Sequence, residues 1–385
     1  MAINKIKYRF MLMQFLLWFT FGTFGIFYVA YLKDLGYSSK FIALGLTLST
    51  IFGISSQYFF GYISDLTSNI KSVFIGLLLA MICTVSSFIF LAPYSVPAIV
   101  IMILFSISWM PLEALLDSWI FSTKDLPLSE YGVIRSSGSL GFSIITVIFG
   151  GLVVKFGFKV SVLAFIISGT LLFITAITTK SKTLKQPTAM GFNQIKQLIT
   201  NPRYMGILFF SILIFIGHMG INNFYIYVVQ NINGNQRLIG MAASMAAFSE
   251  IFGFYLGTKL QKKFNPLLIL VGVALVALIR VYFLTRSETY LGILLTAVLQ
   301  GFSFSIFLGT FKIYISKITP INLLASAQTI AGSTYFGIAS LFANIVGGLL
   351  IDDYGIDSFY KFLNIISVLS IVYIVTLYLV DRRHL

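Results

Sequence analysis

Long apolar segments alternate with short polar ones along the whole chain, and twelve apolar segments can be delimited. An α-helix of ~20 apolar residues spans the hydrocarbon core of a bilayer, so segments of this kind predict transmembrane helices. We place them at residues 8–32, 40–63, 71–92, 95–121, 132–155, 158–179, 204–230, 237–259, 266–285, 289–315, 325–350 and 357–380. The chain is therefore expected to be an all-α integral membrane protein.

The longest polar segment, residues 180–203, separates the first six apolar segments from the last six. This division predicts an N-terminal six-helix bundle over residues 1–180 and a linker over residues 181–203. The C-terminal six-helix bundle then occupies residues 204–385.

Two short sequence pairs recur at nearly the same offset. FGGLVVKFG ends the fifth apolar segment and VGGLLIDDYG ends the eleventh, with Gly150 and Gly347 197 residues apart. GYISD and GTKLQ follow the second and eighth segments, with Gly61 and Gly257 196 residues apart. The offsets indicate duplicated halves of like orientation, and parallel repeats of six spans are the arrangement of major facilitator transporters.

The composition agrees with a membrane protein and the charges indicate its orientation. The chain is 58% hydrophobic and 10% charged, with a mean hydropathy of +0.95, whereas soluble domains carry about 25% charged residues. If the N-terminus is inside, the inside segments hold 17 of the 26 lysines and arginines. The positive-inside rule then places both termini and the linker in the cytoplasm. We attribute the net charge of +14 to this topology and to contact with anionic membrane lipids, not to nucleic-acid binding.

Several function classes lack their sequence signatures. The chain has one cysteine and two histidines, and it contains no HExxH motif, no nucleophile elbow and no Walker A sequence. We therefore expect no enzyme activity, no metal, no cofactor and no coupling to ATP. A channel or a transport-derived sensor stays open as a rival, although neither needs two repeat halves or a titratable carboxylate. A monomer in the cell membrane is expected.

Ionisable residues inside the fourth and fifth apolar segments are the strongest functional signal. They are Glu113, Asp117 and Arg135. A charge near the bilayer centre costs roughly 2.5–3.5 kcal/mol on insertion scales, so such residues are usually paired and functional. Glu113 and Asp117 are one helical turn apart and share a face. A carboxylate accepts hydroxyl hydrogens and a guanidinium presents a planar fork of donors, so Asp117 and Arg135 suit a polar solute. A purely structural salt bridge between the two helices is the alternative.

The segment from Glu113 to Phe142, with EALLDSW and YGVIRSSGSLGF, resembles the lactose permease group and the related nucleoside and phenylpropionate proton symporters of the major facilitator superfamily. The resemblance implies that Asp117 and Arg135 bind substrate. It also places Phe142 where the family has a tryptophan that stacks on a sugar ring.

GYISDLTSNIK, residues 61–71, resembles the cytoplasmic loop motif of the same superfamily. Gly61, Asp65 and Lys71 match the motif, which implies a role in gating. Leu66 and Ser68 depart from it, because they replace a basic residue and a glycine. A polar turn with no gating role is the alternative.

The C-terminal half offers candidates for proton coupling. Glu250 and Arg280 match charged positions of the family, and Gln300 stands where the lactose permease has a histidine. The predicted spans then contain three carboxylates but only two guanidiniums, so one carboxylate is expected to have no permanent partner of opposite charge. Burial raises the pKa of such a group, which favours reversible protonation. Glu250 is the first candidate for the proton carrier and Glu113 the second, unless the spare acid simply stays protonated.

Polar and aromatic side chains also lie on the seventh apolar segment. His218 and Asn222 share one helix face, and Asn223 and Tyr227 share another. We expect these residues to line the substrate cavity, with hydrogen-bonded packing of His218 as the alternative.

Together these features predict a major facilitator fold and a secondary active transporter. The expected activity is proton-coupled uptake of a small polar organic solute, such as a sugar, an oligosaccharide or a nucleoside, by alternating access. A carrier of aromatic or other organic anions, or an efflux carrier for sugars or drugs, is the alternative.

Overall fold

The computed structural model describes residues 2–67, 69–124, 126, 131–180, 198–320 and 324–382 of the chain. Twelve helical segments within these residues are long and apolar enough to cross a membrane. The described residues are almost entirely helical, so the expected all-α membrane architecture with twelve spans is confirmed.

The helices fall into two compact units. Unit 1 comprises Met1–Ala189 with Asn235–Ser244, and unit 2 comprises Met190–Gly234 with Met245–Leu385. The expected linker stays a prediction, because most of it, residues 181–197, lies outside the described residues.

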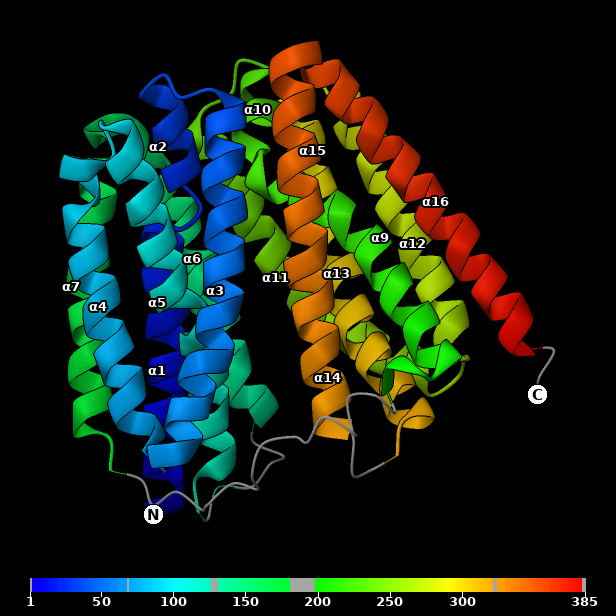
Figure 1. Ribbon diagram of the computed structural model, residues 1–385, viewed down its shortest axis with the longest axis horizontal. Coiled ribbons are helices and arrows are strands. Elements are labelled where there is room, and N and C mark those ends of the chain that lie inside the picture. Colours follow the sequence, from blue (N-terminus) through cyan, green and yellow to red (C-terminus); the bar gives the residue numbers. More distant parts are fainter. Residues whose placement is uncertain are drawn as a thin grey trace. The chain divides into compact units, whose positions relative to one another are not determined.

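Unit 1 is built from the first seven helices and the start of α11 (Gln236–Gln261). These helices are α1 (Ala2–Phe24), α2 (Tyr28–Asp34), α3 (Ser39–Thr67), α4 (Ile70–Leu91), α5 (Ser95–Ser122), α6 (Tyr131–Phe156) and α7 (Lys159–Thr178). Helix α1 packs along both α6 and α7, while α5 packs against α3 and α4 (Figure 1). This packing brings α5 and α6, which carry the predicted N-terminal site residues, into one unit with α1.

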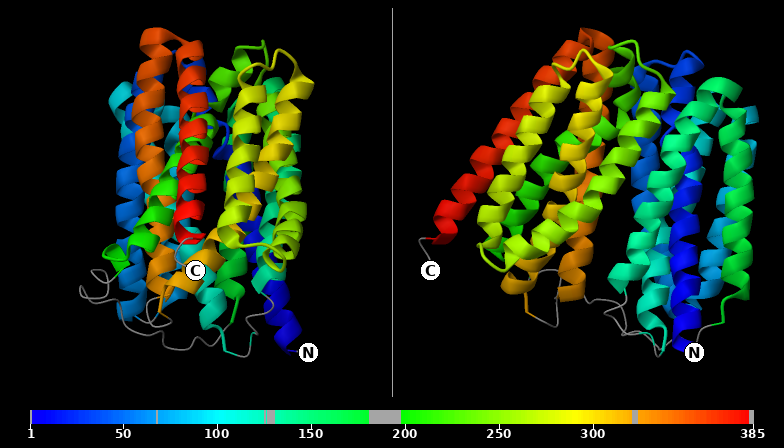
Figure 2. Two further views of the ribbon diagram at one scale, coloured as in Figure 1. Left: turned by 90° about the vertical axis from the view of Figure 1, so that its right-hand side faces the viewer. Right: turned by 180° about the vertical axis from the view of Figure 1, so that it is seen from behind.

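Unit 2 is built from the remaining helices. They are α9 (Pro202–Asn223), α10 (Tyr225–Gln230), α11 (Gln236–Gln261), α12 (Pro266–Leu284), α13 (Tyr290–Ile318), α14 (Leu324–Ser333), the π-helix η3 (Thr334–Ile338), α15 (Ala339–Tyr354) and α16 (Ile356–Arg382). Helix α12 packs against α13 and α16, and α9 packs against α15 and α16 (Figure 2).

Three of the expected spans are interrupted. The first breaks at residues 25–27, where Gly25 lies under the ring of Phe21, and the seventh breaks at Phe224. These spans open the two expected halves, so the breaks lie at corresponding places in the predicted repeat. The eleventh contains the π-helix η3, a local widening that is frequent at functional sites. Hydropathy alone cannot predict such breaks, since the apolar pattern continues through them.

Aromatic rings fill the interior of each unit. In unit 1, Phe24 contacts the rings of Phe88, Phe105 and Phe165. In unit 2, Phe215 lies in contact with Phe307 and other rings of the core. Large apolar side chains remain exposed along the outer helices, as expected where lipid replaces water. On α7 they form one stripe at helical spacing: Leu163, Ile167, Leu171 and Ile174.

Candidate functional site

An ion pair between α5 and α6 is the first element of the site in unit 1. Nη2 of Arg135 lies 2.8 Å from Oε1 of Glu113, and these side chains are 31% and 37% exposed, respectively. Pro111 lies inside α5 two residues before Glu113, where it removes one backbone hydrogen bond of the helix. The partial exposure of both groups within membrane-spanning helices leaves them accessible to a polar solute.

Asp117 lies one turn further along α5 and is held from two other helices. Its Oδ1 accepts a hydrogen bond of 3.0 Å from Nε2 of Gln14 on α1. Its Oδ2 accepts a hydrogen bond of 2.8 Å from the hydroxyl of Tyr131 at the start of α6. Both carboxylates therefore lie at the meeting point of α1, α5 and α6.

Tyr131 lies just outside the fifth span, and all three charges of the site affect its pKa. Burial, followed by the charge of Asp117 and the hydrogen bond to it, raises the pKa of the Tyr131 phenol above its usual value. Arg135 opposes this shift and Glu113 adds to it. The phenol therefore stays protonated and continues to donate its hydrogen bond to Asp117.

An aromatic wall flanks the charged groups. The guanidinium carbon of Arg135 lies 4.8 Å from the centre of the Trp18 ring, within the range of a cation–π contact. Trp18 meets Trp109 and Phe142 edge to face, at centroid distances of 5.7 and 6.0 Å. Phe21 stacks on Trp109 at 4.3 Å. The predicted site residue Phe142 is thus part of an aromatic cluster beside Arg135.

Two glycines of α6 make room for α1 at this point. A Cβ atom on Gly138 would lie 2.6 Å from Cδ1 of Trp18 and 3.2 Å from Nη1 of Arg135. A Cβ atom on Gly141 would lie 2.5 Å from the carbonyl oxygen of Phe15. Close approach of this kind is the usual reason for small residues between membrane helices. Here it also brings Trp18 to Arg135.

The sequence-based prediction missed Gln14, Trp18, Trp109 and Tyr131. Gln14 and Trp18 are one turn apart on the same face of the first span, and Gln14 is fully buried. An amide in an otherwise apolar span was the available signal. Its partner Asp117 is 103 residues away, so only the packing of α1 against the other helices reveals the contact.

In unit 2, four predicted residues from three helices form one chain of polar contacts. Nη2 of Arg280 donates to Oε1 of Gln300 at 2.5 Å, and Nε2 of Gln300 donates to Oδ1 of Asn222 at 3.2 Å. Nδ2 of Asn222 lies 3.0 Å from Nε2 of His218, whose ring stacks on Phe304. The structure thus brings Arg280, Gln300, Asn222 and His218 together.

Other predicted residues of unit 2 lie apart from this chain. Asn223 donates to Oδ1 of Asn344 at 2.6 Å, so its side chain faces α15. Tyr227 lies on α10, edge to face with Phe224. Glu250 is partly buried on α11. Among the described residues no carboxylate forms an ion pair with Arg280, so the coupling role of Glu250 stays a prediction.

The gating residues have different surroundings. Nζ of Lys71 donates to the carbonyl oxygens of Ile177 and Thr179, at 2.7 and 2.8 Å, and so binds the C-terminal end of α7. Gly61 has open space where a Cβ would lie. The side chain of Asp65 lies outside the described residues, so its role as a latch stays a prediction.

Within the described part of the chain, no group of three or more His, Cys, Asp or Glu residues could hold a metal ion. The described side chains of the two sites offer hydrogen bonds, charges and aromatic faces. Such groups can bind a polar organic molecule reversibly.

Comparison with known proteins gives consistent similarities. The family model described as "MFS_1 like family" matches residues 10–362. The maltose permease of Geobacillus stearothermophilus is 24% identical over 250 residues, which is 64% of this chain and 63% of that protein. The uncharacterized transporter YwbF of Bacillus subtilis (strain 168) is 27% identical over 262 residues, 66% of this chain and 63% of that protein. The chain thus spans less than two thirds of the length of these relatives.

Solved structures share the fold. The crystal structure of the nucleoside transporter NupG matches with a TM-score of 0.81 and 16% identity, over 97% of this chain and 98% of that chain. A bacterial homolog of the human lysosomal transporter Spinster matches with a TM-score of 0.67 and 13% identity, over 97% and 95% of the two chains. At these identities the matches establish the architecture alone.

Proposed function

The chain belongs to the MFS_1-like family of major facilitator transporters, and from this premise we propose that it takes up a small polar organic solute by proton-coupled symport. The family and its relatives are transporters rather than enzymes. The solute class that we propose is a sugar, an oligosaccharide or a nucleoside. The names of the maltose permease and the nucleoside transporter NupG support this choice.

One observation carries the proposal: the partly exposed guanidinium of Arg135 forms an ion pair with Glu113 and lies over the ring of Trp18. A sugar ring has hydroxyl groups on its edge and apolar C–H groups on its face. The charged pair can bind the hydroxyls, while an aromatic ring covers the apolar face. A nucleoside offers the same combination, with a base that stacks.

The carboxylate of Asp117 completes this recognition in the proposal. It accepts hydrogen bonds from Gln14 and Tyr131, and a carboxylate has room for about four such bonds. Asp117 can therefore bind a substrate hydroxyl while Gln14 and Tyr131 hold it in place. Arg135 supplies several donors in one plane, which suits neighbouring hydroxyl oxygens.

Coupling to the proton is proposed for Glu250, a carboxylate inside the eighth span. A carboxylate in a membrane helix can gain or lose a proton as its surroundings change between two states of the carrier. We also propose that the protein acts as a monomer in the cell membrane, with both termini in the cytoplasm and with lipids as its neighbours. The clustering of lysines and arginines in the segments that this orientation places inside supports it.

Reconstitution of the full chain into proteoliposomes tests the proposal. Labelled maltose and uridine should each be offered with and without an imposed proton gradient. Accumulation of one of them against its concentration gradient, abolished by a protonophore, is the expected result. Equal accumulation without a proton gradient would contradict symport, and no exchange of any sugar or nucleoside would contradict the proposed solute class.

A further inference from the structure

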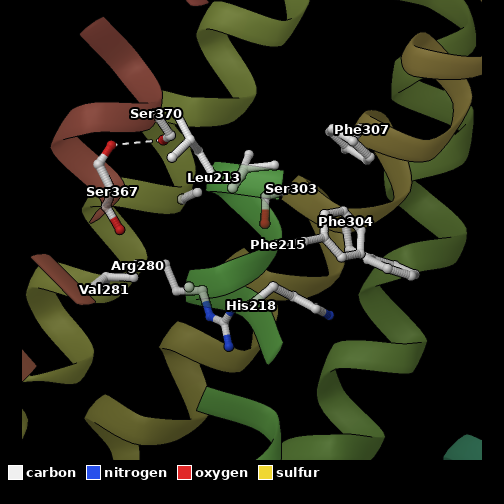
Figure 3. A pocket seen from close by; sticks show the side chains of 13 residues that line it. Leu213, Phe215, His218, Arg280, Val281, Ser303, Phe304, Phe307, Ser367 and Ser370 are labelled. Atoms are coloured by element: carbon white, nitrogen blue, oxygen red, sulfur yellow. Dashed lines mark hydrogen bonds between the residues drawn. The ribbon is translucent and has the colours of Figure 1, made fainter. Parts of the chain in front are cut away.

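A small cavity in unit 2 lies between α9, α12, α13 and α16. Its volume is about 30 Å³, and its polar lining comes from His218, Arg280, Ser303, Ser367 and Ser370 (Figure 3). A cavity needs about 10–15 Å³ on this measure to hold one water molecule. The space therefore accommodates a group the size of a carboxylate or a halide, and it is too small for a sugar ring.

Arg280 brings an incompletely matched charge to this cavity. Its side chain is only 4% exposed, and its Nη2 donates to the neutral amide of Gln300. Its buried Nε has no acceptor among the described residues, and no carboxylate there forms an ion pair with it. A buried charge is strongly unfavourable unless an opposite charge or further hydrogen bonds compensate for it.

The charge of the other intramembrane arginine, Arg135, is compensated within the protein. Arg135 is 31% exposed, forms an ion pair with Glu113 and lies against the ring of Trp18. Glu113 and the Trp18 ring thus compensate the charge of Arg135. The charge of Arg280 has only the neutral amide of Gln300 as a described hydrogen-bond partner, so an additional group has to compensate it. This contrast identifies Arg280 as the cation to which an anion would bind.

The remaining polar groups of the cavity can turn toward an anion. Ser303, Ser367 and Ser370 are all buried, and their hydroxyls donate to carbonyl oxygens of their own helices. A serine hydroxyl rotates readily and can redirect its hydrogen to a better acceptor. None of the residues that line the cavity in the described part of the chain is acidic, so no neighbouring negative charge would repel an anion.

We propose that this cavity binds one monovalent anion, of the size of a carboxylate or a halide, at Nε of Arg280. The anion has two possible sources: the acidic group of a transported solute, or a free inorganic ion such as chloride. In either case the site is separate from the proposed site at Arg135, which binds hydroxyl groups.

The test is thermal unfolding of the purified full chain in detergent, titrated at constant ionic strength. Chloride or formate is added in increasing amounts and replaces gluconate, an anion that is too large for the cavity. Wild type should show a saturable rise in its unfolding midpoint with chloride or formate, because a ligand bound only by the native state stabilises it. In Arg280→Gln the apparent affinity for the anion should fall by roughly 10-fold or more, since a charge-assisted hydrogen bond is lost.

Two further variants control for misfolding. Arg286→Gln removes an exposed arginine that lies on the ring of Tyr282, and it should keep the full anion effect. Ser303→Val removes one hydroxyl donor from the cavity and adds a methyl group without changing the charge, so it should weaken the anion effect while the protein still elutes as a single species. Equal anion affinity in wild type and Arg280→Gln, or no effect of any small anion on wild type, would overturn the proposal.

Transport assays distinguish the two sources of the anion. If the solute supplies its own acidic group, chloride should compete with its uptake. If the anion is free, uptake of a neutral solute should require chloride and should fail in gluconate. The binding measurement does not depend on which solute is carried, so its failure is distinguishable from failure of the proposed symport.

Discussion

The Nη2 atom of Arg135 lies 2.8 Å from Oε1 of Glu113, while Asp117, one turn further along α5, accepts its hydrogen bonds from Gln14 and Tyr131. The two carboxylates share a helix face but have different surroundings. Glu113 forms an ion pair with Arg135, and Asp117 accepts hydrogen bonds from the side chains of Gln14 and Tyr131. This difference gives separate expectations for the two residues and for Arg135.

Arg135→Lys should reduce substrate binding by at least about 10-fold, although the charge is kept, because an ammonium lacks the planar fork of a guanidinium. Arg135→Ala should abolish uptake altogether. Binding of the identified solute to purified protein and uptake into proteoliposomes are the measurements. The matched control is Arg286→Lys, at an exposed arginine outside the spans. Normal uptake by Arg135→Lys would show that Arg135 is structural.

Gly138→Ala should weaken substrate binding by roughly 10-fold, or about 1.4 kcal/mol of binding free energy, because it displaces groups that contact the substrate. The new Cβ would lie 2.6 Å from Cδ1 of Trp18, so the indole has to move relative to Arg135. The same affinity measurement applies.

Gly76→Ala is the control for this variant, because Gly76 lies on a helix of the same unit with nothing within 4 Å of an added Cβ. That substitution should leave binding unchanged and slightly stabilise the helix. If the two variants bind substrate equally well, the contact between Trp18 and Arg135 does not contribute to recognition.

Tyr131 gives a prediction for stability at high pH. Its pKa is raised in the folded state, chiefly by burial, whereas an unfolded tyrosine titrates near 10. The folded state therefore retains this proton after the unfolded state has lost it, so the contribution is fully present below pH ~10 and declines above it. Between pH 9 and 11 the unfolding midpoint of wild type should fall more steeply than that of Tyr131→Phe. Parallel profiles would contradict the shift.

The span pattern was predictable because a membrane imposes it on the sequence. Each crossing helix needs a long apolar segment, and the twelve segments found in the sequence correspond to the twelve spans of the structure. The interruptions at Gly25 and Phe224 and the π-helix Thr334–Ile338 were not predictable. They depend on local backbone geometry and on packing within each unit, to which hydropathy is insensitive.

The site was predictable in its charged residues but not in all of their partners. Intramembrane charges are conspicuous, so Glu113, Asp117 and Arg135 were identified. The ion pair of Glu113 with Arg135 depends on the rotation of α5 relative to α6, and two residues one turn apart are equivalent in helical periodicity. The contribution of α1 through Gln14 and Trp18 is tertiary, because those side chains come from a distant part of the sequence.

Coupling to a proton gradient requires a residue that binds and releases a proton. In a symporter, the loaded and the empty carrier must differ in their tendency to reorient, and a bound proton can produce this difference only through unequal affinity for the two states. Gln300 cannot titrate, and in the structure it accepts a hydrogen bond from Arg280. A carboxylate should therefore bind the proton, and Glu250 is the candidate in the C-terminal half of the chain.

Glu250→Gln mimics the protonated acid. It should therefore retain exchange of solute across the membrane, which needs no net movement of protons, and lose accumulation driven by a proton gradient. Counterflow and gradient-driven uptake in the same proteoliposomes measure the two activities separately. Glu113→Gln should impair solute binding instead, because Glu113 is the ion-pair partner of Arg135. If Glu250→Gln still concentrates solute when a proton gradient is imposed, Glu250 is not the coupling residue. If wild type itself is indifferent to the gradient, uniport or another coupling ion replaces proton symport.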